Sequence, residues 1–282
     1  MKLSPIIPLV FAAIIFFVSS CGKDDPSPFT GLEDLPEDTG GTHTAHTLGS
    51  DASPYAYYLY TPSGYSKDGP KFPLLIFLHG SGEVGNSSSN AKVLDKILVN
   101  GPPKLIKGKE WKPKYPLIVA SLQCHDGYWD VTKTRQVTEF LIANYAVDTT
   151  RIYMTGLSMG GFGTWDQLAV NGLSSHITAA VPICGGGVVT PARVKRAANF
   201  PIWTFHGDAD ATVSPAFSKA MVLAINESTP APAVRAKLTM YPGVGHDSWS
   251  RTYNGAGKGS EDPKYDPFNM DIFEWLLQYK KE

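Results

Sequence analysis

Three side-chain types that together can carry out acyl transfer occur along this chain in the order serine, aspartate, histidine. Ser158 lies within "GLSMG", Asp210 within "HGDADATV" and His246 within "GVGHDSW". A serine hydroxyl is a weak nucleophile until a base removes its proton. A histidine held by a carboxylate is suited to that task, because the carboxylate fixes the tautomer and stabilises the imidazolium that forms. The sequence therefore predicts a Ser-His-Asp triad assembled from three distant segments.

The glycines around Ser158 are typical of a sharp turn between a strand and a helix. The apolar run "RIYMTGLS" precedes the turn, and the helix-like "GFGTWDQLAVNG" follows it. In such a G-x-S-x-G elbow the nucleophile adopts strained backbone angles, so Gly156 and Gly160 must lack side chains. A phosphate-binding loop is the alternative, but the pattern G-x-x-x-x-G-K-[ST] is absent here. We therefore expect the Ser158 hydroxyl to stand exposed at the start of a helix.

Two aspartates compete for the role of the acid that orients His246. Asp208 and Asp210 both follow the apolar run "FPIWTF". Asp210 lies farther along the loop, where the chain turns back, and we predict that it reaches the imidazole. Asp208 is expected to hydrogen-bond its own turn. Asp247, next to the histidine, is expected to be a loop acceptor.

An acyl-transfer site also needs donors for the oxyanion. One is expected from the backbone N–H of Met159, the residue after the nucleophile, and the other from the loop "LHGSGE". In that loop Ser81 offers its N–H, and the flanking glycines let the backbone approach the substrate. Losing one such donor typically costs about 3 kcal/mol of transition-state stabilisation.

Aromatic residues and histidines also lie near other strand ends. Tyr128 and Trp129 in "QCHDGYWD" could line an acyl or sugar pocket or could pack in the core, and the sequence leaves both possibilities open. His79 and His206 each precede a glycine at a strand end, and we expect both to bond the loops that follow them.

Short apolar runs alternate with helical stretches and indicate the elements that position these residues. A parallel sheet buried on both faces requires such runs. The fold predicted is α/β, a mostly parallel central sheet with helices on both faces and all strand C-termini at one edge, where ligands bind. The apolar runs span residues 72–80, 115–123, 151–158, 179–187 and 200–207.

The composition is that of a globular protein with near-neutral charge. The chain has 282 residues, 43% of them hydrophobic, and a formal net charge of -1. It gives no electrostatic basis for binding nucleic acid. Of the three cysteines, Cys124 and Cys184 could pair in an exported protein, but buried free thiols are favoured. No cysteine pair has the close spacing of a zinc site, and no metal or cofactor is expected.

The N-terminus has the features of an export signal. Lys2 precedes the apolar run "IIPLVFAAIIFFV", and "VSSC" resembles a bacterial lipobox that would be lipidated at Cys21. We predict a lipoprotein signal peptide at 1–20, a flexible tether at 21–43, rich in Pro, Gly and acidic residues, and a catalytic domain at 44–282. The expected location is the outer membrane, reached through the lipid anchor, with a periplasmic or secreted protein as the alternative.

Five segments taken together resemble the α/β-hydrolase superfamily. They are "FLHGSGE", "DTTRIYMTGLSMGGFGTW", "PICGGG", "HGDADATV" and "GHDSW". The branch they resemble contains secreted esterases and predicted peptidases related to feruloyl and acetylxylan esterases and to polyhydroxybutyrate depolymerases. This resemblance covers roughly residues 45–280 and implies the nucleophile Ser158, the acid Asp210, the base His246 and an oxyanion loop at "HGSG". No large inserted lid is visible.

The activity that this resemblance implies is hydrolysis of carboxylic esters by an exported enzyme. Acyl groups on carbohydrates or plant polymers are the expected substrates. A serine peptidase or a polyester or lipid esterase with the same triad is an alternative within enzymes. A surface sugar-binding lipoprotein with a vestigial triad is an alternative from another class.

Overall fold

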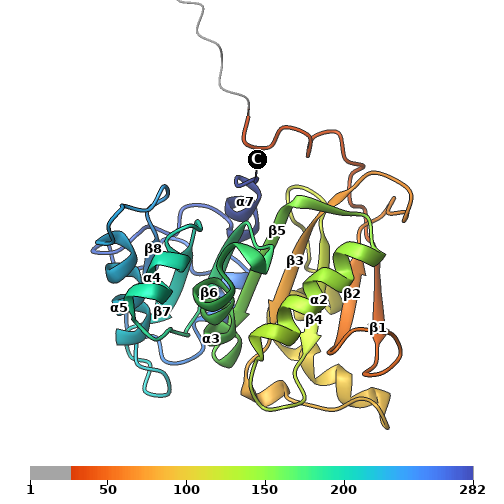
Figure 1. The fold of residues 1–282 in the computed structure, drawn as a ribbon, viewed down its shortest axis with the longest axis horizontal. Coiled ribbons are helices and arrows are strands. Elements are labelled where there is room, and N and C mark those ends of the chain that lie inside the picture. Colours follow the sequence, from red (N-terminus) through yellow and green to blue (C-terminus); the bar gives the residue numbers. More distant parts are fainter. Residues whose placement is uncertain (1–26, 282) are drawn as a thin grey trace, which may run out of the picture.

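One sheet of eight strands organises the part of the chain that the structure describes, residues 27–281 of the computed structural model (Figure 1). The strand order is β1-β2-β4-β3-β5-β6-β7-β8. β2 pairs antiparallel with both β1 and β4, and every other pairing is parallel. The strands are β1 Thr42–His46, β2 Ala56–Thr61, β3 Phe72–Leu78, β4 Ile118–Gln123, β5 Val147–Leu157, β6 Ala179–Ile183, β7 Trp203–Gly207 and β8 Lys237–Tyr241. This is the α/β-hydrolase fold, and the predicted fold class is confirmed.

The central strands are buried along their whole length. All seven residues of β3, all six of β4 and all five of β6 are buried. β1 lies at the edge of the sheet, and none of its residues is fully buried. Continuous apolar runs are what a parallel sheet covered on both faces requires, which explains why these strands could be recognised in the sequence.

Helices cover both faces of the sheet, as expected. The alternation along β3 shows the two sides, because Ile76 contributes to one hydrophobic core and Phe77 to the other. Buried residues of α2, α3, α4 and α5 belong to the first core, and those of α1, α6 and α7 to the second. The helices are α1 Gly101–Lys107, α2 Val131–Asn144, α3 Met159–Asp166, α4 Pro191–Ala197, α5 Ala216–Asn226, α6 Trp249–Tyr253 and α7 Ile272–Leu277.

The last helix is shorter than its amphipathic sequence pattern suggests. The pattern begins just after Pro267, but α7 starts only at Ile272. The Asp271 side chain accepts hydrogen bonds from the N–H groups of Phe273 and Glu274, and so caps the helix at that point. The capping residue, rather than the apolar periodicity, sets where this helix begins.

The end of the expected tether is packed against the domain. Leu32 is only 2% exposed and belongs to the second core, and Phe29 lies against Tyr115 with ring centroids 5.1 Å apart. Arg151 donates a hydrogen bond to the carbonyl of Thr30. The prediction of a flexible tether at 21–43 is therefore corrected for its described part, residues 27–43. Leu32 and its neighbours attach this segment to the domain, although its polar composition had predicted an unstructured stretch.

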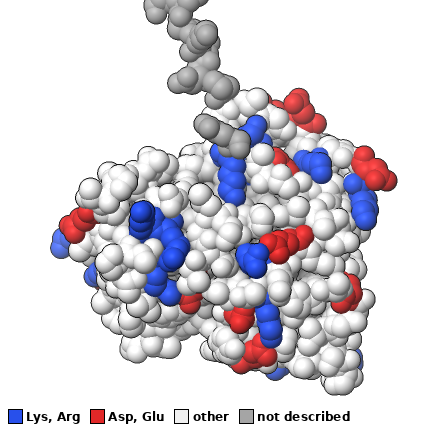
Figure 2. Space-filling model, viewed as in Figure 1, with Lys and Arg blue, Asp and Glu red and all other residues white. Residues whose placement is uncertain are grey.

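The predicted signal peptide and the lipidation residue Cys21 lie outside the described residues. Within residues 27–281, no helix combines the length and apolar character needed to cross a membrane. On the face drawn in Figure 2, acidic and basic side chains are interspersed over much of the surface.

Candidate active site

The turn at Ser158 joins β5 to α3 in a strained backbone conformation. Ser158 has φ 52° and ψ -117°, a region that residues with side chains rarely occupy. A side chain at Gly160 would collide with the carbonyl of Leu78 in the neighbouring strand, and one at Gly156 would collide with the carbonyl of Gly160. The two glycines therefore let the serine stand at the C-terminal edge of the sheet, at the first turn of a helix.

His246 joins the serine and the aspartate with its two ring nitrogens. Its Nε2 lies 2.8 Å from Ser158 Oγ, and its Nδ1 lies 2.7 Å from Asp210 Oδ2. A carboxylate only accepts, so Nδ1 carries the proton and Nε2 is free to accept one from the serine hydroxyl. The structure thus brings together the three residues that the sequence singled out, in a geometry suited to a nucleophile, a base and an orienting acid.

Asp210 is held as a charged acceptor under the imidazole. Its Oδ1 accepts hydrogen bonds from the N–H groups of Thr212 and Val213, each at 2.9 Å. Burial alone would raise the pKa of Asp210, but hydrogen bonds from His246, Val213 and Thr212 hold this pKa below its usual value. The carboxylate is therefore ionised at neutral pH and can stabilise a protonated imidazole.

The loop that begins at Gly80, which the sequence predicts to supply an oxyanion donor, lies next to Ser158. A side chain built at Gly80 would lie 3.6 Å from Ser158 Cβ and 2.7 Å from Leu157 Cδ1. Ser81, the next residue, begins a short 3₁₀ turn, Ser81–Glu83. Met159 is the first residue of α3, so its N–H has no acceptor within the helix. The two predicted donors, Ser81 and Met159, thus come from the loop next to the nucleophile and from the turn that holds it.

His79 sets the direction in which the Ser81 N–H points. His79 Nε2 accepts a hydrogen bond from the Cys124 N–H at 2.9 Å, so the proton is on Nδ1, which donates to the Gly80 carbonyl at 2.6 Å. Burial lowers the pKa of His79 to about 4, and the ring is neutral at pH 7. In a trans peptide the C=O and the N–H point in opposite directions. Because His79 holds the Gly80 carbonyl, the Ser81 N–H faces away from the His79 ring.

A pocket of about 270 Å³ opens beside Ser158 and His246. Its wall comes from the oxyanion loop 80–83, from Val99, Asn100 and Leu157, and from Trp249 at the start of α6. The connection between β6 and β7 contains only the short helix α4, and in the described residues no large insertion covers this edge of the sheet. The pocket is small, and both apolar and polar residues line it.

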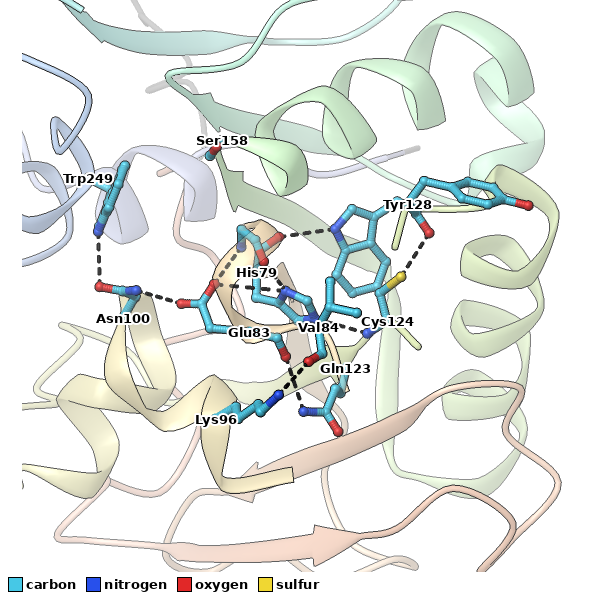
Figure 3. Close-up of polar contacts among 12 residues, drawn as sticks. His79, Glu83, Val84, Lys96, Asn100, Gln123, Cys124, Tyr128, Ser158 and Trp249 are labelled. Atoms are coloured by element: carbon cyan, nitrogen blue, oxygen red, sulfur yellow. Dashed lines mark hydrogen bonds and ion pairs between the residues drawn. The ribbon is translucent and has the colours of Figure 1, made fainter. Parts of the chain in front are cut away.

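Tyr128 and Trp129 do not line this pocket. Trp129 is 6% exposed, its indole N–H donates to the His79 carbonyl at 3.1 Å, and its ring lies 4.9 Å from that of His79. Tyr128 is 60% exposed, and its backbone carbonyl accepts from the Cys124 thiol (Figure 3). The possibility of a substrate-pocket role is therefore not supported for either residue. Trp129 instead packs against His79 and Gly163.

Besides Leu157 of the "GLSMG" turn, four pocket residues were not singled out as site residues from the sequence. Glu83 and Trp249 lie within the quoted motifs "LHGSGE" and "GHDSW", and their proximity to motif residues was the available signal. Val99 and Asn100 lie at the end of a 3₁₀ segment, Ala91–Val99, for which the sequence offered no functional signal.

The remaining candidate side chains have structural partners. Asp208 accepts from the Gly243 N–H at 2.6 Å, so it ties its loop to the histidine loop rather than to its own turn. Asp247 accepts from the Ser250 N–H, as a loop acceptor. Cys124 and Cys184 are buried and unpaired. Within residues 27–281, no three or more His, Cys, Asp or Glu side chains gather in a way that could hold a metal ion.

A sequence profile of the dienelactone hydrolase family matches residues 125–273, a segment that contains Ser158, Asp210 and His246. The chain belongs to the dienelactone hydrolase family. This family lies within the α/β-hydrolase superfamily, and the membership agrees with the strand order and with the elbow at Ser158. The resemblance to this superfamily inferred from the sequence motifs is confirmed.

Proteins similar to this family member include several esterases. A bifunctional acetylxylan esterase/xylanase of Neocallimastix patriciarum is 26% identical over 155 residues, which are 54% of this chain and 21% of that protein. A crystal structure of a thermostable esterase is 26% identical, with a TM-score of 0.60 over 86% of this chain and 63% of its own. The chain thus spans about a fifth of the first protein and less than two thirds of the second.

A mutant feruloyl esterase module from Clostridium thermocellum, solved with sinapinate, shares the fold at 16% identity. Its TM-score is 0.54, with 90% of this chain and 92% of that module covered. At this identity the likeness shows a shared fold.

Proposed function

We propose that this member of the dienelactone hydrolase family cleaves esters through an acyl-enzyme on Ser158, with His246 as general base and acid and Asp210 as its orienting partner. The observation that carries the proposal is the position of His246, which is within hydrogen-bonding distance of both Ser158 Oγ and Asp210 Oδ2. No other described side chain is needed for proton transfer in this scheme.

In the acylation half, Ser158 Oγ attacks the ester carbonyl carbon while His246 Nε2 takes the hydroxyl proton. The negative charge that develops on the carbonyl oxygen is stabilised by the N–H groups of Ser81 and Met159. The tetrahedral intermediate collapses when the bond to the alcohol oxygen breaks, and His246 gives its proton to that leaving alcohol.

In the deacylation half, a water molecule replaces the alcohol. His246 takes a proton from the water as the water oxygen attacks the acyl carbon, and then returns the proton to Ser158 Oγ as the acid leaves. Because only neutral His246 can accept the proton, we expect the rate to fall in acid solution.

The proposed substrates are acyl groups carried by carbohydrates or plant polymers. The match to an acetylxylan esterase/xylanase supports this class, and so does a pocket of about 270 Å³, which suits a small acyl or sugar-ring group rather than a long chain. The short β6–β7 connection leaves the pocket accessible to a substituent on a polymer.

A fluorophosphonate probe and a panel of esters test the activity. We expect one covalent adduct on Ser158, lost in Ser158→Ala, and faster turnover of acetylated or feruloylated saccharides than of long-chain alkyl esters or peptide amides. Preference for long-chain esters would favour a lipid or polyester hydrolase, and preference for amides would favour a peptidase. The absence of both adduct and turnover would favour a binding lipoprotein.

We further propose that the protein is exported and anchored through Cys21. The charged residue Lys2, the apolar run and the small residues before Cys21 support this proposal. Metabolic labelling with a clickable palmitate analogue should tag the wild-type protein in bacterial membranes. Cys21→Ala should lose the label and leave the membrane fraction, and labelling that survives this substitution would contradict the anchor.

A further inference from the structure

Glu83 is a buried carboxylate beside the pocket that the mechanism above does not use. It is 3% exposed. Its Oε2 accepts the Gly80 N–H at 2.8 Å, and its Oε1 accepts an Asn100 Nδ2–H at 2.5 Å (Figure 3). Both oxygens thus have donors, and the charge-assisted bonds to a carboxylate are stronger than bonds between neutral groups.

The same contacts continue across the pocket toward the catalytic histidine. Asn100 Oδ1 accepts the Trp249 indole N–H at 3.1 Å. The Trp249 ring in turn stands edge-to-face against the His246 ring, with centroids 5.2 Å apart and planes at 86°. In Figure 3 the dashed lines lead from the oxyanion loop through Glu83 and Asn100 to Trp249.

We propose that Glu83 is a positioning residue that, through Asn100 and Trp249, holds the oxyanion donor of Ser81 and the imidazole of His246 in fixed relative positions. The inference rests on the proposed triad mechanism and adds to it a side chain that touches neither the nucleophile nor the reacting atoms.

The position of Glu83 within the loop explains how it acts on Ser81. His79 holds the carbonyl of Gly80, and Glu83 holds the N–H of the same residue, so the peptide planes on both sides of Gly80 are fixed. The Ser81 N–H belongs to the second of these planes. Because a displacement of about 1 Å at a catalytic group can cost on the order of 10²-fold in rate, loss of one of these bonds is expected to affect the transition state more than the bound ester.

A buried carboxylate at this place is better explained by positioning than by stability alone. Burial raises the pKa of Glu83, opposed by its bonds to Asn100 and Gly80. Removing a charge from water is costly, and an apolar side chain of similar size is often as stabilising. An apolar side chain could not accept hydrogen bonds from both the Gly80 N–H and the Asn100 amide, as Glu83 does.

Glu83→Gln is the test, since the glutamine amide retains the size but offers one acceptor where the carboxylate offers two. Its NH₂ group must face either the Gly80 N–H or the Asn100 amide. We expect kcat on p-nitrophenyl acetate to fall 10- to 100-fold with KM changed less than threefold. The affinity for a boronic acid that forms a tetrahedral adduct on Ser158 should fall by the same factor as kcat/KM, because both depend on the oxyanion donors.

Asn100→Ala and Lys96→Ala complete the design. Asn100→Ala keeps the Glu83–Gly80 bond but breaks the link to Trp249, so a smaller loss of about 3- to 10-fold in kcat is expected, and it carries the test if Glu83→Gln does not fold. Lys96 donates to the Val84 carbonyl next to the same loop from an exposed position, and Lys96→Ala should match the wild type in kcat and boronate affinity.

The outcomes separate this inference from the proposed mechanism. If the wild-type protein forms no boronate or fluorophosphonate adduct, the triad mechanism fails, and the inference fails with it. If the wild type forms adducts but folded Glu83→Gln and Asn100→Ala bind the boronate as tightly and keep the wild-type kcat, only the positioning role is overturned. A lowered Tm with unchanged kcat would likewise assign Glu83 to stability alone.

Discussion

His206 Nε2 lies 3.2 Å from Asp210 Oδ2, the same oxygen that accepts the His246 Nδ1–H at 2.7 Å. His206 is fully buried, and its Nε2 also lies 3.0 Å from the Val213 carbonyl. Asp210 is therefore contacted by His206 of β7 and by the N–H groups of its own loop as well as by His246. This arrangement explains how one of two neighbouring aspartates becomes the partner of the base, while the other ties the loops together.

Replacing Asp210 by asparagine should abolish most of the activity while leaving the fold in place. Asparagine lacks the negative charge of the carboxylate and no longer fixes the proton on His246 Nδ1. The tautomer in which Nε2 can accept the serine proton is then lost. In a Ser-His-Asp triad this change costs about 10⁴-fold in kcat. Steady-state kinetics of Asp210→Asn on p-nitrophenyl acetate measure it.

The matched control for this prediction is Asp208→Asn. The Asp208 side chain accepts one described hydrogen bond, from the Gly243 N–H, and the amide oxygen of an asparagine can still accept it. We expect its kcat to stay within about threefold of wild type. Equal losses in the two variants would mean that the loop as a whole, rather than Asp210, orients the histidine.

The contribution of Asp210 to the stability of the folded protein should be lost in acid. Its pKa in the folded state is lowered, so the folded state binds its proton less tightly than the unfolded chain does. Asp210 therefore contributes fully to the unfolding free energy above its unfolded-state pKa of about 3.9. This contribution is lost as the pH falls through its lower folded-state pKa. Urea denaturation of Ser158→Ala and Ser158→Ala/Asp210→Asn between pH 3 and pH 7 measures the difference in unfolding free energy.

We expect the gap between these two proteins to be largest near neutral pH and to shrink below about pH 4. The Ser158→Ala background removes turnover from the comparison and keeps the Asp210–His246 bond. A gap that grows toward acid pH would show that the sign is wrong, and that Asp210 is more basic when folded.

The elements that hold the triad could be predicted because their signals are local. Continuous apolar runs identify buried parallel strands, and the G-x-S-x-G turn requires glycine at two positions whatever the rest of the sequence is. Ser158, Asp210 and His246 each follow or lie near a strand end, and a parallel sheet brings such ends to one edge. Their order and loop context were therefore enough to single out three side chains that the structure brings together.

Contacts that depend on the folded surface were harder to predict. Asn100 reaches Glu83 and Trp249 only after its 3₁₀ segment packs beside the oxyanion loop, and nothing in its own neighbourhood marks it. Between Tyr128 and Trp129, which of two adjacent aromatics turns inward depends on the space beneath His79. Leu32, one apolar residue in a polar stretch, is buried only once the second core, built from several distant elements, has formed.

Leu32→Ala tests whether residues 27–41 belong to the folded domain. Truncating a fully buried leucine removes its transfer free energy and leaves a cavity, at a typical cost of about 2–4 kcal/mol. We expect that loss in the unfolding free energy measured by urea denaturation. We expect kcat to stay unchanged, because the neighbouring Thr30 is bonded to Arg151 in the N-terminal half of β5, whereas Ser158 follows the C-terminal end of that strand. Leu35→Ala, at a partly buried position nearby, should cost less. A free tether would instead give no change for either variant.

Trp129→Ala and Tyr128→Ala together distinguish a core residue from a substrate contact. Trp129 fills space under His79 and against Gly163, so its removal should lower the unfolding free energy by about 3–5 kcal/mol. Its indole N–H also holds the His79 carbonyl, at the start of the oxyanion loop, so we expect a loss in kcat as well. Tyr128 is 60% exposed, and Tyr128→Ala should leave both stability and kinetics on p-nitrophenyl acetate near wild type. If Tyr128→Ala raised KM severalfold for feruloylated or acetylated oligosaccharides alone, the residue would contact the polymer beyond the pocket, and its exposed ring would have a role that the small ester does not report.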